Sequence, residues 1–265
     1  MAITTLDQYI AAASQHVQIR KTGSVTAVAL MNTQVLQAAG NPGAGTLAGT
    51  NTANGLVPTD ADAGFPVINA FGGSATGYIG NITFGSTVAS RITLFDCLFK
   101  AGAYAFNANT TLASQPSYSG RVIGGTDFTN TEIWIEAVTA FTGNQSIAVT
   151  YTNQSGTAAR TTGTIATGVA PIVGRMLQLP LQAGDTGVQK IESVVSTVST
   201  VGTFNVLVLR RLWSGRVLVA NAGDIHDFLK TGMPQIFDNS ALMAIVQPDG
   251  TATGIFELVV EVING

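Results

Sequence analysis

The sequence predicts a mainly β protein, with a β-sandwich or jelly-roll region over residues 116–265 and a mixed α+β region over residues 1–115. Short runs of Val, Ile, Leu, Phe and Tyr alternate with small polar residues through the second half of the chain. Glycine-containing turns separate these runs, and no apolar pattern of helical spacing extends far there. Many short strands with frequent turns are typical of sandwiches and jelly-rolls.

The first predicted element is a short helix that begins near Leu6. Thr5 fits its N-cap, and Gln8 follows at the spacing of a capping box. One apolar stripe runs along it, made of Leu6, Tyr9, Ile10, Ala13 and Val17. Such a helix docks either on its own domain, which we favour, or on a neighbouring subunit.

An extended arm is predicted over residues 40–64, where the sequence is GNPGAGTLAGTNTANGLVPTDADAG. The Gly40-Asn41-Pro42 tripeptide ends the apolar run before it, and large apolar side chains are almost absent. Loops of this length are uncommon in compact domains unless they are functional or disordered. The arm is therefore expected either to lie across a neighbouring subunit or to form a mobile surface loop.

Residues 86–102, STVASRITLFDCLFKAG, complete the mixed region as a predicted second helix. Ser86 fits its N-cap, and Gly102 fits its end. One helical face would carry Val88, Ile92, Phe95, Leu98 and Phe99. The segment LASQPSYSG, residues 112–120, marks the predicted boundary between the two regions.

Beyond residue 120 the chain is predicted to be nearly all strand. Residues 131–156 alternate, turn at TGNQ and alternate again, which predicts a hairpin with Ile133 and Ile135 on one face and Trp134 on the other. Further strands are predicted at VGRMLQLPL, VQKIESVVSTVS, TFNVLVLRRLW, ALMAIVQ and GIFELVVEVI, with PDGTATG as the turn between the last two. One helical turn is predicted in AGDIHDFLKTGMP.

Charged residues are scarce. Asp, Glu, Lys and Arg make up 10% of the chain, whereas soluble domains carry about 25%. A free monomer usually keeps a charged surface for solubility, so this composition favours a protein that packs against neighbours. The net charge is −3 without a basic cluster, so we expect no nucleic-acid partner. The sequence contains no apolar stretch of about 18 residues, so we expect no membrane partner.

Candidate catalytic and metal sites are weak. Asp224, His226 and Asp227 form the best local cluster, but no second His lies near it in sequence, and zinc needs three or four ligands. The single Cys97 sits in an apolar run, which predicts a buried thiol rather than a nucleophile. The sequence lacks a G-x-S-x-G elbow and a phosphate-binding glycine pattern. We expect no enzymatic activity, cofactor, metal or small-molecule substrate, although a new kind of site around His226 stays open.

The segment RRLWSGRV supplies further interface candidates. Arg and Trp are the residue types that dominate interface hot spots, and here they interrupt a very apolar strand. The alternative is a strand end at which Arg stems cover apolar surface. The predicted interface residues are Leu6, Tyr9, Ile10, Arg210, Arg211, Trp213 and Arg216.

Three runs of sequence carry a resemblance to virus proteins. They are RITLFDCLFKAGAYAFNANTTLASQPSYSGR; EIWIEAVTAFTGNQSIAVTYTNQSGTAARTTG with APIVGRMLQLPLQAGDTGVQKIESV; and GTFNVLVLRRLWSGRV. Over residues 65–240 the chain resembles tailed-bacteriophage virion structural proteins, and more closely an uncharacterised capsid-associated, decoration-type family. The resemblance carries no catalytic motif. It implies a non-enzymatic protein that works by assembly in the virion, which is assembled in the host bacterial cytoplasm.

The expected function is therefore that of a capsid decoration, or cement, protein on the outside of the head. It would bind the major capsid protein and copies of itself, through many contacts repeated by symmetry. A trimer would match the three-fold sites of a capsid. This expectation rests on capsid symmetry and not on particular residues. A tail or baseplate component (tube, hub or fibre attachment) is the alternative, because it would have the same composition. A secreted carbohydrate-binding sandwich would need clustered aromatic residues, whereas Trp and Tyr are spread along this sequence.

Overall fold

Two strands of unusual length organise the fold. The computed structural model describes residues 3–46, 51–73, 76–107, 109–142, 144, 146–166, 172–196 and 201–265. Within it, β6 (Ser90–Ala105) and β14 (Thr203–Val217) pair antiparallel along nearly their whole lengths. Both strands are buried on both faces over most of their residues. Their nearly continuous apolar sequence is what a strand in the middle of a protein requires.

The two long strands form the middle of a seven-stranded sheet, which we call the central sheet. Its order is β12 (Met176–Leu179), β8 (Thr131–Thr139), β14, β6, β17 (Leu242–Pro248) and β2 (Thr33–Gln34), and β4 (Asn51–Leu56) also pairs with β6.

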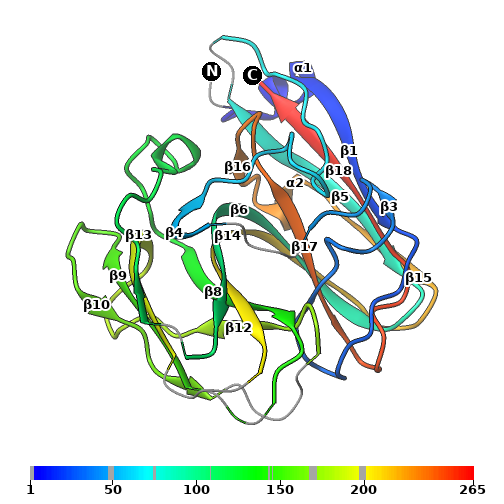
Figure 1. Ribbon diagram of the computed structural model, residues 1–265. Coiled ribbons are helices and arrows are strands. Elements are labelled where there is room, and N and C mark those ends of the chain that lie inside the picture. Colours follow the sequence, from blue (N-terminus) through cyan, green and yellow to red (C-terminus); the bar gives the residue numbers. More distant parts are fainter. Residues whose placement is uncertain are drawn as a thin grey trace.

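Two further sheets lie on either side of β6 and β14 in the view of Figure 1. The terminal sheet has the order β15 (Ala222–His226), β5 (Gly77–Ser86), β18 (Phe256–Asn264), β1 (Ala13–Lys21) and β3 (Gly40–Asn41), with β16 (Gln235–Ile236) on β5. The lateral sheet has the order β10 (Arg160–Thr161), β9 (Ser146–Asn153), β13 (Val188–Ser196) and β7 (Asn109–Thr111), with β11 (Ile165–Ala166) on β9. The strand pairs between described residues are all antiparallel.

Each outer sheet shares an apolar core with part of the central sheet. The terminal sheet packs Ile82 and Val260 against Leu94. The lateral sheet packs Val149 against Ile135. Because side chains alternate along β14, its residues serve these two cores on one face and a third core on the other.

The third core lies on the opposite face of the central sheet. Loop residues Leu36 and Phe65 there cover Cys97, Leu209 and Met243. Long connections rather than a sheet therefore close this side of the molecule.

The two cores on the shared face meet at a buried ion cluster. Asp96 of β6 pairs with Arg121 and, at 3.4 Å, with Arg210 of β14. The Asp96 carboxylate also accepts hydrogen bonds from the Ser240 hydroxyl (2.8 Å) and the Ala241 amide (3.0 Å). Arg121 ends a 3₁₀ turn, Ser119–Arg121, so the cluster joins distant parts of the chain.

The prediction of a mainly β protein is confirmed, and so is the capping box at the first helix. In α1 (Leu6–Ala11) the Gln8 amide donates to the Thr5 hydroxyl at 3.2 Å. The helix is shorter than its predicted stripe, because Ala13 and Val17 belong to β1. The predicted turn near residue 230 is α2 (Phe228–Thr231).

The predicted helix over residues 86–102 is wrong. This stretch contains the end of β5 and most of β6. Its apolar residues occur at helical spacing, but a strand buried on both faces produces the same run. Phe95 and Leu98, predicted on one helical face, instead lie in different cores.

The predicted hairpin over residues 131–156 is also wrong, although both of its strands exist. β8 pairs with β12 and β14, whereas β9 pairs with β13, β10 and β11. The two strands therefore belong to different sheets and face each other across a shared core, where Ile135 and Val149 lie. Alternation predicted the strands correctly but not their partners.

The arm predicted over residues 40–64 lies partly on the chain's own sheets. β3 pairs with β1, and β4 pairs with β6. Residues 47–50 of the arm lie outside the described part.

The boundary predicted near residue 115 cuts through all three sheets. β1 pairs with β18, β6 pairs with β14, and β7 pairs with β13. Each of these pairs joins strands from the two predicted regions.

Candidate assembly surface

Two short helices form an exposed apolar patch at one end of the terminal sheet. The rings of Tyr9 in α1 and Phe228 in α2 are in contact, with centroids 5.0 Å apart. Beside them, Leu6 is 57% exposed, Ile10 is 71% exposed and Leu229 is 77% exposed. No side chain of α1 is fully buried. We call these five residues the helix patch.

Polar contacts fix the helix patch to the sheet beneath it. The Tyr9 hydroxyl donates to Glu261 of β18 at 3.2 Å. Burial, and then the nearby Glu261 carboxylate, raise the pKa of Tyr9, so its hydroxyl remains a donor at neutral pH. Asp227 caps α2 by accepting from the Lys230 amide at 3.0 Å, and the Thr231 hydroxyl bonds to backbone carbonyls of β5.

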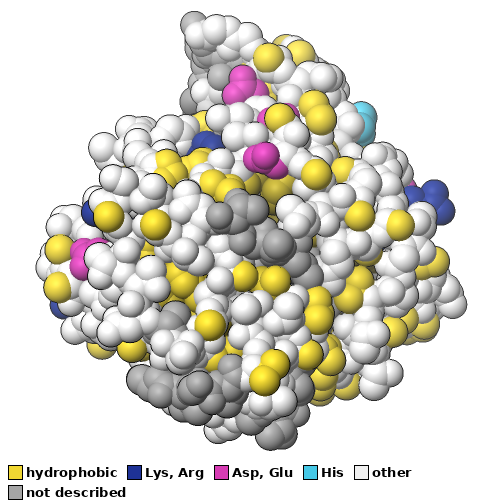
Figure 2. Space-filling model, viewed as in Figure 1, with side chains coloured by type: hydrophobic (Ala, Val, Ile, Leu, Met, Phe, Trp, Pro, Cys, Tyr) yellow, Lys and Arg dark blue, Asp and Glu magenta, His cyan; other side chains and the backbone are white. Residues whose placement is uncertain are grey.

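The surface as a whole carries few charges, as the composition requires. Figure 2 shows charged side chains scattered over one face, separated by neutral polar and apolar surface. Interface cores are depleted in charged residues because their desolvation is unfavourable. A partner could therefore cover much of this surface without stripping water from many charges.

The predicted interface residues of the opening helix all lie in the helix patch. Leu6 and Ile10 are exposed, and Tyr9 is half-buried between the two helices. The structure thus brings these three together and adds Phe228 and Leu229 from a segment far away in sequence.

Arg210 and Trp213, also predicted at an interface, lie inside the chain instead. Arg210 is 6% exposed and contacts Asp96. Trp213 is 4% exposed, and its Nε1 donates to His226 Nδ1 at 3.0 Å. Neither side chain is presented to a partner, because each has an internal polar partner that the sequence pattern does not reveal.

Arg211 and Arg216 do reach the surface. The Arg211 guanidinium forms two hydrogen bonds with Glu132, at 2.9 and 3.2 Å, and lies over the Phe95 ring. Arg216 is 3.8 Å from Asp249, with both side chains well exposed. Arg211 matches the alternative in which an Arg stem covers apolar surface, whereas Arg216 is a solvent-exposed side chain near the end of β14.

The side chains of Asp224, His226 and Asp227 make contacts within the chain. His226 accepts from Trp213, and its Nε2 lies 3.7 Å from Asp224, while Asp227 caps α2. Within the described ranges, no group of three His, Cys, Asp or Glu side chains is placed to hold a metal ion. Nor does that part of the chain contain a helix with the length and apolar character needed to cross a membrane.

Sequence reasoning missed the contribution of α2 to the helix patch. The available signal was the adjacent pair Phe228 and Leu229 directly after Asp227, a good N-cap residue. A capped single turn has room to bury only one of two neighbouring apolar side chains. The other, Leu229, is left in solvent.

Comparisons with known proteins do not show a family. No family model matches the chain, and no curated protein matches it. Among solved structures, the VP2 subviral particle of infectious bursal disease virus aligns at 11% identity over 96% of this chain and 79% of that chain, with a TM-score of 0.16. The Gt strain of the same virus aligns at 8% identity over 95% and 81%, with a TM-score of 0.17. Likeness at this level carries no argument about function.

Proposed function

We propose that this protein is a virion structural protein that decorates the outer surface of a tailed-bacteriophage capsid. The observation that carries the proposal is the helix patch, in which three large apolar side chains are more than half exposed. The resemblance of the three sequence runs supplies the phage context. The proposed partners are the major capsid protein and further copies of this chain.

The proposed mechanism is multivalent burial of neutral surface. Fully burying a Leu or Ile side chain contributes about 1.5–3 kcal/mol, so the helix patch offers one contact of moderate strength. Copies arranged by capsid symmetry would add many such contacts at high effective concentration. The sum would hold neighbouring capsomers together against the internal pressure of packaged DNA.

A sandwich arrangement supports this role. We infer that the terminal and central sheets pack face to face as one β-sandwich, because they share an apolar core. The lateral and central sheets share another core and would form a second sandwich. Such packing would present α1 and α2 in a fixed orientation. Preorganisation of this kind lowers the entropy lost when a partner binds.

A tail or baseplate component is the second candidate, favoured by a separate observation. Leu218 and Val219, 73% and 66% exposed, follow β14 at the end of the terminal sheet where Ser86 pairs with Ala222. The helix patch lies at the other end, where Ala13 pairs with Asn264. Apolar patches at opposite ends suit head-to-tail stacking into rings or tubes.

The test is rebinding to virus particles that lack the protein. The purified chain is sized by light scattering and then sedimented with capsids stripped of it, and separately with tails. We expect an oligomer that sediments with capsids, and Leu6→Ser should weaken this binding by about tenfold, because 1.4 kcal/mol corresponds to that factor.

Leu218→Ser is the matched control, because it makes the same change in an exposed leucine at the opposite end of the sheet. Under the decoration proposal it leaves capsid binding unchanged. Binding to tails alone, with both variants weakened, would support the second candidate. Binding to neither particle would overturn the assembly proposal.

A further inference from the structure

The first part of β1 forms a free edge of the terminal sheet. β3 covers β1 only where Asn41 pairs with Arg20 and Gly40 pairs with Lys21. Over residues 13–19 the outer side of β1 has no partner strand in the described part of the chain. Figure 1 shows β1 at the rim of this sheet, beside β18. A free edge offers unpaired backbone N–H and C=O groups to another strand.

The pairing beyond this edge shows which backbone groups point outward. The Thr22 N–H donates to the Ala39 carbonyl at 2.8 Å, on the side of β3. Successive residues of a strand direct their backbone groups to opposite sides. Ser14, His16 and Gln18 therefore direct their N–H and C=O groups away from β18. No described residue supplies a hydrogen-bond partner for these groups.

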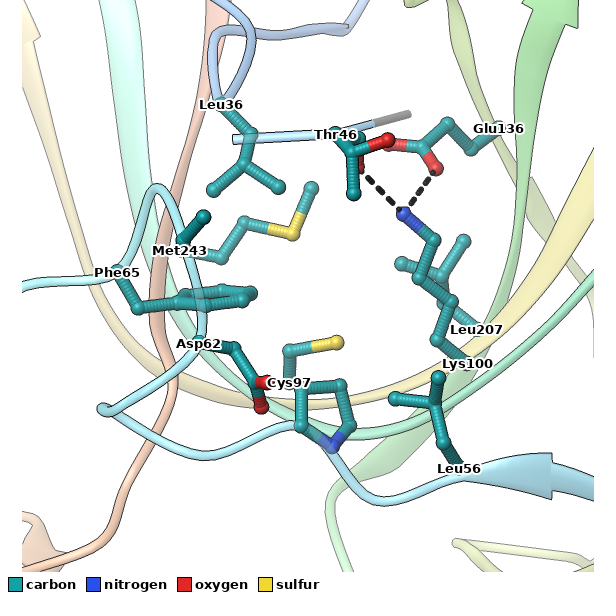
Figure 3. Close-up of a pocket in the computed structure, with 12 residues that line it drawn as sticks. Leu36, Thr46, Leu56, Asp62, Phe65, Cys97, Lys100, Glu136, Leu207 and Met243 are labelled. Carbon is teal, nitrogen blue, oxygen red and sulfur yellow. Dashed lines mark hydrogen bonds and ion pairs between the residues drawn. The ribbon is translucent and has the colours of Figure 1, made fainter. Parts of the chain in front are cut away.

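The segment that contains β3 is held away from this edge on both sides. Before β3, Leu36 packs in the core that the loops cover. After β3, Pro42 lacks an N–H, and the Thr46 carbonyl accepts from Lys100 at 3.2 Å. Figure 3 shows Leu36, Thr46 and Lys100 around one pocket, which the central sheet also lines. β3 therefore cannot extend along β1 to cover residues 13–19.

The inner face of β1 is closed by the chain itself. Gln15 Nε2 donates to the Asn69 carbonyl at 2.9 Å, and Gln15 Oε1 accepts from the Asn69 amide at 2.8 Å. Val17 is buried in the core of the terminal sheet. His16, between them, is exposed on the outer face. A partner therefore reaches β1 through its edge and its outer face.

We propose that two copies of the chain join their β1 strands antiparallel, with the two-fold axis at His16. In this register His16 faces His16 of the second copy, and Ser14 faces Gln18. Each of these residues carries one N–H and one C=O, so six hydrogen bonds form between the copies.

Neither neighbouring register pairs all of these groups. A shift of two residues in one direction places Gln18 opposite Ala12, whose N–H already donates to the Tyr9 carbonyl at 3.3 Å. A shift in the other direction places Ser14 opposite Arg20, whose outer side already pairs with β3. The free part of the edge is thus centred on His16.

The side chains along the edge suit a second copy. Residues 13–19 have the sequence ASQHVQI, without Asp, Glu, Lys or Arg. Edge strands that must not pair with one another usually carry Lys, Pro or a β-bulge. This edge has neither Lys nor Pro, and β1 pairs with β18 without a register shift. Two identical strands therefore meet here without like charges opposite each other.

The opposite edge of the terminal sheet, β15, is protected instead. The Asp224 carboxylate accepts from the Ile225 N–H at 2.8 Å, so this backbone donor is already used. An antiparallel pair centred on Asp224 would also place two carboxylates opposite each other, which is unfavourable. Of the two edges, β1 is therefore the one that fits a second copy.

A cysteine on the two-fold axis tests the register. Facing residues in a hydrogen-bonded antiparallel pair have Cα atoms about 5.5 Å apart, which is within the range of a disulfide. We expect His16→Cys to form a covalent dimer on mild oxidation, measured by mass without reductant. Cys97 is 1% exposed, so the unsubstituted chain should not crosslink.

Ser14→Cys is the matched control. In the proposed register the two copies of residue 14 are offset by four residues, or about 13 Å along the strands, which is too far for a disulfide. This variant should therefore remain uncrosslinked under the same conditions. Crosslinking of Ser14→Cys as readily as His16→Cys would overturn the proposal.

His16→Pro tests the hydrogen bonds without oxidation. The His16 N–H points away from β18, and proline is tolerated at such edge positions. The substitution removes two of the six hydrogen bonds between the copies. We expect it to raise the Kd of the dimer about tenfold or more, measured by sedimentation equilibrium of the full chain. Should this variant not fold, the two cysteine variants decide.

The dimer goes beyond the proposed function, because it needs neither the helix patch nor a capsid. The unsubstituted chain should double its mass as its concentration rises. A chain that stays monomeric at high concentration, or a His16→Pro variant that dimerises as tightly, would overturn the proposal. A monomer that sediments with capsids would overturn the dimer alone, whereas a dimer that ignores virus particles would overturn the proposed function alone.

Discussion

Asp96 joins three segments of the chain at the point where two apolar cores meet. Its carboxylate forms ion pairs with Arg121 and Arg210, and it accepts hydrogen bonds from the Ser240 hydroxyl and the Ala241 backbone amide. The Asp96 and Arg121 side chains are almost fully buried, at 0% and 2% exposure. Buried charges are tolerated when they are paired and hydrogen-bonded in this way. We therefore expect the cluster to fix how the segments meet rather than to add much net stability.

We expect Asp96→Asn to lower the free energy of unfolding by about 3–5 kcal/mol, because it removes the carboxylate that pairs with two buried guanidinium groups. Urea denaturation followed by tryptophan fluorescence measures the change. Asp249→Asn is the control, since it makes the same substitution in the exposed pair with Arg216. That pair should contribute about 0–1 kcal/mol. Equal losses in the two variants would show that the Asp96 cluster is not the junction described.

Single residues also mark the limit of what the sequence predicts about the candidate surface. Leu6 and Ile10 could be proposed as interface residues because they share one apolar stripe of the predicted helix. Arg210 could not be placed, because its partner Asp96 lies 114 positions away in sequence. An arginine in an apolar strand is compatible both with a surface contact and with a buried ion pair.

At the scale of elements, the sequence predicts strands better than it predicts their partners. Alternation located β8, β9, β12, β13 and β18. Continuous apolar runs located β14 and β17, which are buried on both faces, but the same kind of run in β6 also fits a helical spacing and so predicts a helix. Pairing is set by packing between distant segments, such as β1 with β18, and local sequence carries no sign of it.

The packing of the arm on its own chain gives a prediction for β4. Gly55 has a φ of +69°, and a Cβ there would overlap the Phe99 ring of β6. Gly55→Ala should therefore lower the free energy of unfolding by about 1–3 kcal/mol through overpacking, in addition to the strain of the left-handed backbone. Thermal denaturation of the purified protein measures this loss.

Gly72→Ala separates the two contributions to that loss. Gly72 has a φ of +87° but no atom within 4 Å of its Cβ position, so this variant carries the strain without the clash. The Gly55 variant should be the less stable of the two. If instead Gly55→Ala leaves the isolated chain as stable as Gly72→Ala and weakens only particle binding, residues 51–56 lie on a neighbour rather than on β6.

At the scale of the whole molecule, we expect the three sheets to unfold as one cooperative unit. Each sheet combines strands from before and after residue 115, and β6 and β14 pass from one apolar core to the next. Loss of either part of the chain would leave every sheet incomplete. Unfolding of one sheet should therefore be coupled to unfolding of the others.

The two tryptophans of the chain test this coupling, because Trp134 and Trp213 lie in different cores. The variants Trp134→Phe and Trp213→Phe each leave one fluorescent probe. Each substitution shifts stability by itself, so the comparison is made within a variant, between its fluorescence and its circular dichroism. We expect the two signals to give one shared midpoint in each variant, as a two-state transition requires.

The fragment of residues 116–265 gives the most direct test of the boundary that the sequence predicts. It keeps β8, β9 and β13 but lacks β1, β5 and β6, which pair with β18 and β14. The long strand β14 would then expose the row of backbone groups that β6 occupies, and its apolar faces would meet water. We expect the fragment to aggregate or to show no cooperative unfolding transition, whereas the full chain shows one. A soluble fragment with a sharp transition would instead mean that the second half folds alone, and that β1, β5 and β6 add to a core already formed.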